Sequence, residues 1–160
     1  MNTFTIETIF HSFEKISELP SEIQNVMNKA IEARDNAYAP YSKFQVGAAV
    51  LLHDGTIVKG SNQENAAYPS GLCAERTAVF AVGANYPKHS IKAICISASS
   101  MLKETTEPIP PCGACRQSLL EYENKQEDKI PVYFMGKSGD IMQSPSIKNL
   151  LPFIFKEDSL

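Results

Sequence analysis

The sequence predicts a single α/β domain in which helices cover both faces of a mixed sheet. Apolar stretches with helical spacing alternate along the chain with short β-rich stretches, which favours a three-layer α/β/α arrangement. A chain of 160 residues can build one well-packed core but hardly two. No repeat, low-complexity segment or Gly/Ser linker marks a domain boundary. We therefore assign residues 21–160 to this domain and residues 1–20 to an N-terminal extension of unknown role, either a loose helix or an arm packed on a neighbour.

The first half of the domain predicts a helix followed by a hairpin. Ser21 can cap a helix whose apolar residues recur at positions 23, 26, 27, 30, 31 and 33, and Pro40 prevents its continuation. The Asp54-Gly55 dipeptide lies between the apolar stretches 46–50 and 57–59 and predicts a β-hairpin with a type I′ turn. Glycines, prolines and polar residues dominate from 60 to 71, which indicates a long loop facing the site.

The second half alternates helices and strands. We expect a helix over residues 73–84, a strand buried on both faces over 91–98 and a helix over 111–123. A short strand at 132–135 and a last helix at 146–150 complete the series. Cys95, inside the apolar strand, is expected to be a buried core residue. The polar run 123–129 is most simply a solvated loop.

Charge and composition argue against several classes of protein. The net charge is −3, with 43% hydrophobic and 21% charged residues, so no basic field exists to hold a polynucleotide. No apolar run approaches the roughly 20 residues that cross a bilayer. The first residues lack the basic and apolar regions of a signal peptide, so we expect a cytoplasmic protein. Clustered cysteines in a reducing compartment more often bind metal than form disulfides.

Two cysteine-containing segments, C-A-E-R at 73–76 and P-C-G-A-C-R-Q at 111–117, carry the chemistry. Cys112 and Cys115 are three residues apart at a predicted helix start, so both sulfurs can face one point. With Cys73 they would fill three corners of a zinc tetrahedron and leave the fourth for water, as in catalytic zinc sites. A structural zinc site would need a fourth ligand, but no second CxxC or paired histidine is present. The three histidines stand alone: His11, His53 and His89.

Glu75 supplies the acid–base chemistry that such a site needs. It lies two residues after Cys73, where a carboxylate can reach a water on the metal, take its proton and pass it to a departing amine. Three thiolates around Zn²⁺ also leave an excess of negative charge, which a nearby cation should offset. Arg76 is the first candidate for this cation, and Arg116 is the competing one.

The two segments match the signature of zinc nucleobase deaminases. Further segments, P-Y-S-K-F at 40–44, N-Q-E-N-A at 62–66 and L-L-P at 150–152, resemble the small homotetrameric cytidine deaminases. The resemblance implies one Zn²⁺ per chain and hydrolytic deamination of cytidine and deoxycytidine to uridine and deoxyuridine with release of ammonia, a step of pyrimidine salvage. Zinc-activated hydroxide would attack C4 of the pyrimidine, with Glu75 as proton shuttle.

The resemblance also implies a set of substrate contacts. Asn62 and Glu64 match the pair that binds the ribose 3′-hydroxyl, and Phe44 matches an aromatic residue that packs against the pyrimidine. The backbone around Ala66 and Ala74 resembles groups that read the polar edge of the pyrimidine. Phe44 has an alternative interpretation as an ordinary core residue.

Two further positions, Tyr68 and Phe155, fall where the family builds part of the pocket across subunit boundaries. Phe153 is the alternative for Phe155, because the ending offers two phenylalanines for one position. We therefore expect a homotetramer that acts on a free pyrimidine nucleoside, with neither a polynucleotide nor a membrane as partner.

Three other functions fit parts of the sequence. An enzyme of the same fold could act on another aminopyrimidine, such as a cytosine-containing antibiotic nucleoside. A polynucleotide-editing deaminase should show a basic channel, whereas this chain is acidic. A non-catalytic zinc-binding module would use Glu75 merely to cap a helix.

Overall fold

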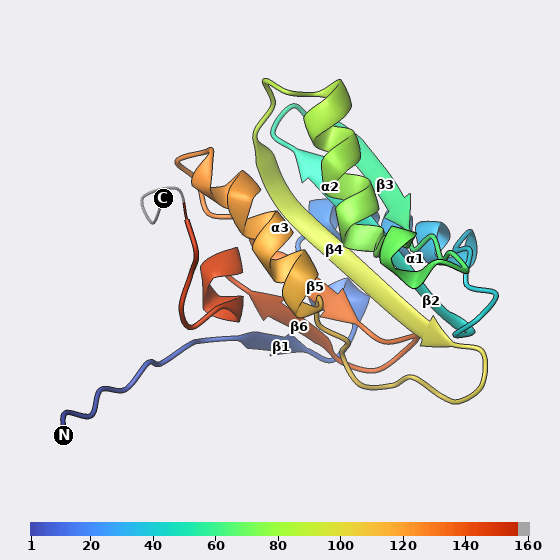
Figure 1. Ribbon diagram of the computed structural model, residues 1–160, viewed down its shortest axis with the longest axis horizontal. Helices are drawn as coiled ribbons and strands as arrows, with labels where there is room; N and C mark the ends of the chain where they lie inside the picture. Colours follow the sequence, from blue (N-terminus) through green and yellow to red (C-terminus); the bar gives the residue numbers. More distant parts are fainter. Residues whose placement is uncertain (157–160) are drawn as a thin grey trace.

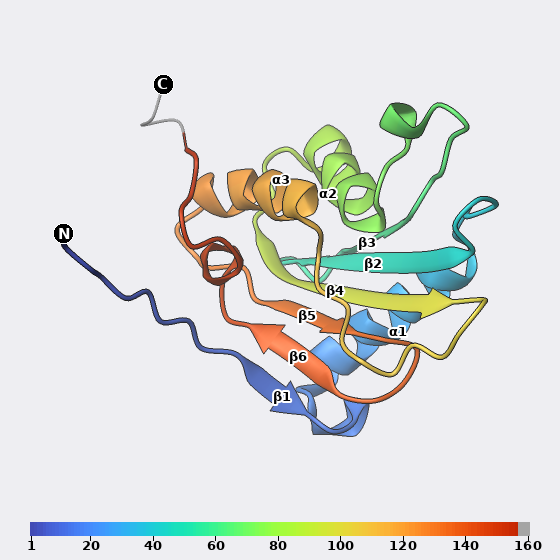
Figure 2. The ribbon, with the colours of Figure 1, turned by 60° about the horizontal axis from the view of Figure 1, so that its bottom comes forward.

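The computed structural model describes residues 1–156, which form three layers around one six-stranded sheet (Figure 1). Helix α1 covers one face of the sheet, and helices α2 and α3 cover the other (Figure 2). The predicted three-layer α/β/α domain is thereby confirmed. The helices are α1 (Ser21–Asp35), α2 (Ala74–Asn85) and α3 (Gly113–Asn124), with short 3-10 helices η1 (Ile16–Glu18), η2 (Tyr68–Ser70) and η3 (Ile147–Leu150). The strands are β1 (His11–Phe13), β2 (Phe44–Leu52), β3 (Ile57–Ser61), β4 (Ile91–Ser100), β5 (Val132–Met135) and β6 (Ile141–Ser144).

The sheet is mixed, with the strand order β1-β6-β5-β4-β2-β3. Strands β4 and β5 are parallel, and the other neighbours are antiparallel. As predicted, β4 is buried on both faces: Ala93 and Cys95 face the core under α1, whereas Ile94 and Ile96 face the core under α2 and α3. Cys95 is fully buried, also as predicted, and burial raises the pKa of its thiol.

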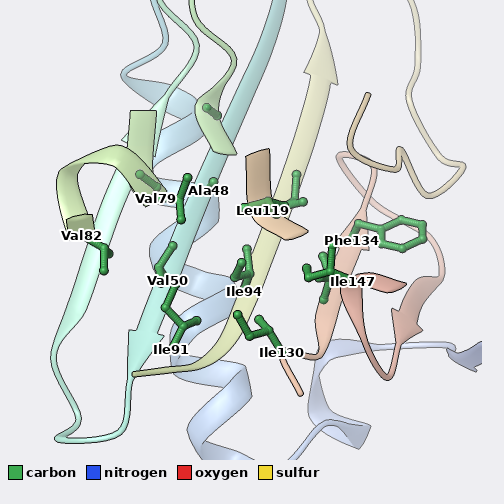
Figure 3. Packing of buried hydrophobic residues seen from close by; sticks show 14 of the residues in the cluster. Ala48, Val50, Val79, Val82, Ile91, Ile94, Leu119, Ile130, Phe134 and Ile147 are labelled. Atoms are coloured by element: carbon green, nitrogen blue, oxygen red, sulfur yellow. The ribbon is translucent and has the colours of Figure 1, made fainter. Parts of the chain in front are cut away.

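The core between the sheet and the pair α2–α3 sets the position of both helices. Val79 of α2 and Leu119 of α3 pack with Ile94 of β4 in this core (Figure 3). Helix α2 also approaches β3 closely at Gly60, where a Cβ atom would lie 2.4 Å from the backbone nitrogen of Ala78. Only glycine permits this approach, so the first turn of α2 is held firmly against the sheet.

The predicted hairpin is confirmed, but its turn is not of type I′. That type needs positive φ at both central residues. Gly55 has φ +88°, whereas Asp54 lies outside the positive-φ region. Leu52 and Thr56 close a three-residue loop, with Leu52 N–H donating to the carbonyl oxygen of Thr56 at 2.9 Å. Oδ1 of Asp54 accepts a hydrogen bond of 2.9 Å from Thr56 N–H, which stabilises this longer loop.

Two short strands, β1 and β6, were not predicted. Strand β1 pairs antiparallel with β6, with Phe13 opposite Ile141, so part of the N-terminal extension is an edge strand rather than a loose helix. The last predicted helix is the single turn η3, in which Ser146 caps through its side chain. In residues 1–156, no helix combines the length and apolar character that crossing a bilayer requires.

Glu123 lies at the end of α3 and is only 3% exposed, in contrast to the solvated position that the polar run suggested. Its carboxylate accepts hydrogen bonds of 2.8–3.3 Å from the backbone N–H groups of Ile130, Ile147 and Lys148. It also accepts one of 2.7 Å from the hydroxyl of Ser146. The side chain therefore joins α3 to η3 and fixes the start of the C-terminal segment.

We expect Glu123→Ala to lower the free energy of unfolding by about 3 kcal/mol, because it leaves several buried donors without an acceptor. Denaturation in urea measures the change. Glu121→Ala is the matched control, since Glu121 is exposed on the same helix and its ion pair within residues 1–156, with Lys125 at 3.7 Å, is solvent-exposed. Equal losses for the two variants would contradict the assigned role of Glu123.

Candidate active site

Three cysteines meet where α2 and α3 begin. Cys73 is the N-cap of α2, Cys112 is the N-cap of α3, and Cys115 lies in the first turn of α3. Their Sγ atoms all lie within 4.8 Å of one another, and those of Cys73 and Cys112 are 3.8 Å apart. Two thiolates at about 2.3 Å from a tetrahedral zinc ion would also lie about 3.8 Å apart. The donor set therefore fits one zinc ion, with the fourth corner left open among the described residues.

Local electrostatics favour the thiolate form that binds metal. The N-terminal ends of two helices carry partial positive charge and point at the cluster. A hydrogen bond from the Cys115 thiol, assisted by the Arg76 guanidinium, lowers the pKa of the Cys73 thiol to about 5. The Cys73 thiol can therefore give up its proton to a metal at neutral pH. The hydrogen bond to Cys73 and burial raise the pKa of the Cys115 thiol, so a metal ion must displace that proton.

Glu75 lies in the first turn of α2, next to this cluster, and is 5% exposed. Burial raises the pKa of its carboxyl group to about 6, and the charge of Cys73 acts in the same direction. A carboxyl group with such a pKa can both accept and donate a proton near neutral pH. The structure therefore places the buried carboxyl group of Glu75 beside the three thiols.

The two candidate cations differ in what they contact. Nη2 of Arg76 lies 3.7 Å from Sγ of Cys73, and its Nε is buried without an acceptor in the described part of the chain. Arg116 instead donates to backbone carbonyl oxygens, from Nε to Pro111 at 2.8 Å and from Nη1 to Leu150 at 3.1 Å. Of the two candidates, Arg76 is therefore the one that lies beside a thiol, whereas Arg116 ties α3 to the C-terminal segment.

Arg76→Gln should weaken zinc retention by about 10- to 100-fold, the usual effect of removing a group that supports metal ligands. Elemental analysis after dialysis against a graded chelator measures the loss. Arg116→Gln is the matched control, because it removes an arginine that contacts no thiol, and it should keep its zinc. Equal retention by wild type and Arg76→Gln would show that the charge of Arg76 is not needed.

A cavity of about 480 Å³ opens beside the cluster and reaches Cys73 and Arg76. Of the predicted substrate contacts, Asn62, Glu64 and Tyr68 line it. A second cavity of about 550 Å³ lies between the C-terminal ends of α2 and α3, away from the thiols, and contains none of the predicted site residues. The cavity beside the cysteines is therefore the candidate substrate site.

The carboxylate of Glu64 is held by the loop that precedes β2. Oε2 accepts hydrogen bonds from the backbone N–H groups of Tyr41 at 2.9 Å and Ser42 at 3.2 Å, and Oε1 accepts one from the hydroxyl of Ser42. The Ser42 hydrogen bond lowers the pKa of Glu64, so the carboxylate is ionised at neutral pH. Tyr41 and Ser42 also line the cavity, although sequence reasoning assigned neither a role of its own.

The side chain of Asn62 stabilises the start of β2 through two hydrogen bonds to the backbone of the strand. Its Oδ1 accepts a hydrogen bond of 2.8 Å from Val46 N–H, and its Nδ2 donates one of 2.9 Å to the carbonyl oxygen of Phe44. Phe44 itself is half-buried and is not among the described residues that line the cavity. The same holds for Ala66, which is exposed, and for Ala74, whose side chain is fully buried.

The two positions expected at subunit boundaries are exposed. Tyr68 on η2 is 77% exposed, with its ring 6.2 Å from that of Tyr41. Phe155 is 58% exposed and Phe153 is 75% exposed. Nε2 of Gln117 donates a hydrogen bond of 3.1 Å to the carbonyl oxygen of Phe155 and so holds this segment beside α3. All three aromatic rings are accessible to another molecule.

Comparisons with known proteins place this site in a class. The family model for the cytidine and deoxycytidylate deaminase zinc-binding region matches residues 20–127, which include both cysteine segments. The class that fold and site define is therefore that of the zinc-binding deaminases. A cytidine deaminase of Sporosarcina psychrophila is 41% identical over 139 residues, which cover 87% of this chain and 95% of the relative.

Two further similar proteins are also cytidine deaminases. A cytidine deaminase of Halalkalibacterium halodurans is 41% identical over 137 residues, covering 86% of this chain and 96% of the relative. The crystal structure of cytidine deaminase from Burkholderia pseudomallei superposes with a TM-score of 0.70 at 39% identity, covering 82% of this chain and 97% of that one. This chain belongs to the cytidine deaminase family.

Proposed function

We propose that the chain catalyses the hydrolytic deamination of cytidine and deoxycytidine to uridine and deoxyuridine, with release of ammonia. The observation that carries the proposal is a cluster of three thiols beside the buried carboxyl group of Glu75, which reaches, through Cys73, a cavity that Asn62 and Glu64 also line. Relatives with 41% identity that are cytidine deaminases support the choice of substrate.

In this proposal Cys73, Cys112 and Cys115 would hold one zinc ion per chain, and the ion would supply an activated water as the nucleophile at neutral pH. Glu75 accepts a proton from the water and delivers it to the ring nitrogen next to C4, which makes C4 more electrophilic. The water oxygen bonds to C4. Glu75 then carries the second proton of the former water from its oxygen to the exocyclic nitrogen. The C4–N bond breaks, ammonia leaves, and the oxygen stays on C4 as the carbonyl of uridine.

The other predicted contacts would orient the nucleoside. Asn62 and Glu64 bind the sugar hydroxyl, Phe44 packs against the pyrimidine, and the backbone at Ala66 and Ala74 reads its polar edge. The position of Glu64 in the lining of the cavity supports the first of these assignments. The net charge of −3 supports a free nucleoside rather than a polynucleotide as substrate.

We further propose a homotetramer in which Tyr68 and Phe155 complete pockets of neighbouring chains, with Phe153 as the alternative for Phe155. The exposure of these aromatic rings supports the proposal, since large apolar side chains gain most from burial at an interface. We also propose that the reaction serves pyrimidine salvage and takes place in the cytoplasm.

Substrate preference tests the proposed function. Wild type should turn over cytidine and deoxycytidine much faster than cytosine or a cytidine monophosphate. Glu64→Ala should lower kcat/KM for cytidine by about 10- to 100-fold, because it removes a charge-assisted hydrogen bond. The same variant should leave the slow turnover of cytosine almost unchanged. Equal losses on cytidine and cytosine, or wild-type turnover of cytosine as fast as that of cytidine, would contradict the sugar contact.

A further inference from the structure

Ser42, which is not among the predicted site residues, holds the carboxylate of Glu64 through a hydrogen bond. The Ser42 hydroxyl donates a hydrogen bond to Oε1 of Glu64 and accepts one of 3.0 Å from Phe44 N–H. Two backbone N–H groups of the same loop, those of Tyr41 and Ser42, occupy Oε2. The loop that precedes β2 therefore fixes both carboxylate oxygens of Glu64.

The number of these hydrogen bonds limits what else the carboxylate can bind. An ionised carboxylate offers about four lone-pair sites and no donor. The Tyr41–Ser42 loop fills three of the sites of Glu64 with two N–H groups and one hydroxyl. One site is left at the wall of the cavity, which suits a single hydroxyl donor and repels an anion such as a phosphate group.

The backbone of the loop is unusual at the residue that follows Ser42. Lys43 has φ +57° and is the only non-glycine residue with positive φ in the part of the chain that the structure describes. This conformation is unfavourable for a residue with a Cβ atom. It is held by Lys43 N–H donating to the carbonyl oxygen of Ala39 at 3.2 Å and by Met101 N–H donating to that of Lys43 at 2.8 Å. Lys43 directly follows Tyr41 and Ser42, which line the cavity, and a strained residue kept in place there points to a function of the loop.

We propose that Ser42 is a positioning residue that selects the substrate: its hydroxyl orients Glu64 so that the remaining carboxylate site accepts a hydrogen bond from the sugar 3′-hydroxyl. The inference rests on the proposed function, because it needs a nucleoside as substrate. Ser42 does not touch the reacting atoms. Its loss should therefore weaken binding of the nucleoside and leave the chemical step intact.

The test compares Ser42→Ala with wild type on cytidine and on 3′-deoxycytidine, which lacks the hydroxyl. For cytidine we expect KM to rise by about tenfold with kcat nearly unchanged, since a misplaced carboxylate loses one charge-assisted hydrogen bond. For 3′-deoxycytidine we expect almost no change. Ser42→Thr keeps the hydroxyl and should restore most of the affinity for cytidine. Zinc content should equal that of wild type in all variants.

A second comparison separates positioning from a general effect on the loop. In a Glu64→Ala background, Ser42→Ala should cause no further rise in the KM for cytidine, because the effects of two residues that act through one contact are not additive. Equal losses on the two nucleosides, or full additivity with Glu64→Ala, would show that Ser42 merely supports the loop and would overturn the inference. Wild type that does not deaminate cytidine at all would instead overturn the proposed function.

Discussion

Glu75→Gln should lower kcat for cytidine by about 10²- to 10⁴-fold, the typical contribution of a general acid–base group, while zinc stays bound. The amide has the shape of the carboxylate but cannot carry the proton from water to the ring and on to the amine. Because Glu75 is 5% exposed, bulk water has little access with which to replace it. Steady-state kinetics together with elemental analysis of the same preparation measures both quantities.

Glu121→Gln is the matched control for this prediction. Glu121 is an exposed residue of α3 with no described contact to the cysteines, so its variant should have wild-type kinetics. If Glu75→Gln kept more than about a tenth of wild-type activity, Glu75 would lie outside the main proton-transfer path. If it lost its zinc, the residue would be a support of the metal site rather than a proton carrier.

Replacement of any one of the three clustered cysteines by serine should remove zinc and reduce activity to background. A neutral hydroxyl is a much poorer zinc ligand than a thiolate, and two remaining thiolates hold the metal weakly. The variants are Cys73→Ser, Cys112→Ser and Cys115→Ser, with metal content measured on the folded fraction after gel filtration.

Cys95→Ser controls for the loss of a thiol elsewhere in the chain. Cys95 is fully buried in β4 and lies in the core under α1, on the other side of the sheet from α2 and α3. Its folded variant should keep one zinc ion per chain. Normal zinc in Cys73→Ser, or lost zinc in Cys95→Ser, would show that the ligand set is wrong.

The metal cluster could be predicted from the sequence because its geometry is nearly local. Cys112 and Cys115 are placed by one turn of α3, and α2, whose N-cap is Cys73, has a clear sequence pattern. The central strand β4 was predictable for the same reason, since a long apolar run has few alternatives. The three-layer order then follows from the alternation of these elements.

Features that depend on distant partners could not be predicted in this way. Strands β1 and β6 have three and four residues, and only their pairing with each other and with β5 makes them strands. Asp54 was expected to adopt positive φ, but its own side chain stabilises a longer turn through Thr56. Glu123 is buried because donors more than 20 residues away surround it, which no local polar run reveals.

Among the residues of the candidate substrate site, too, some could be predicted from the sequence and others could not. Glu64 was singled out by its resemblance to a sugar-binding position, but what fixes its carboxylate is Ser42, 22 residues earlier in the chain. The sequence gives no sign of this contact, since a serine in a loop is common and its hydroxyl partner depends on how β2 and the loop after β3 meet. A structure was needed to connect the two.

An ultraviolet assay of cytidine loss, with and without a zinc chelator, tests the central claim most directly. The account predicts that purified wild type converts cytidine to uridine and ammonia in equal amounts. It also predicts that the chelator abolishes this activity and that added Zn²⁺ restores it. A folded protein with one zinc ion per chain that leaves cytidine unchanged, or one that deaminates cytidine equally well after its zinc has been removed, would contradict the account.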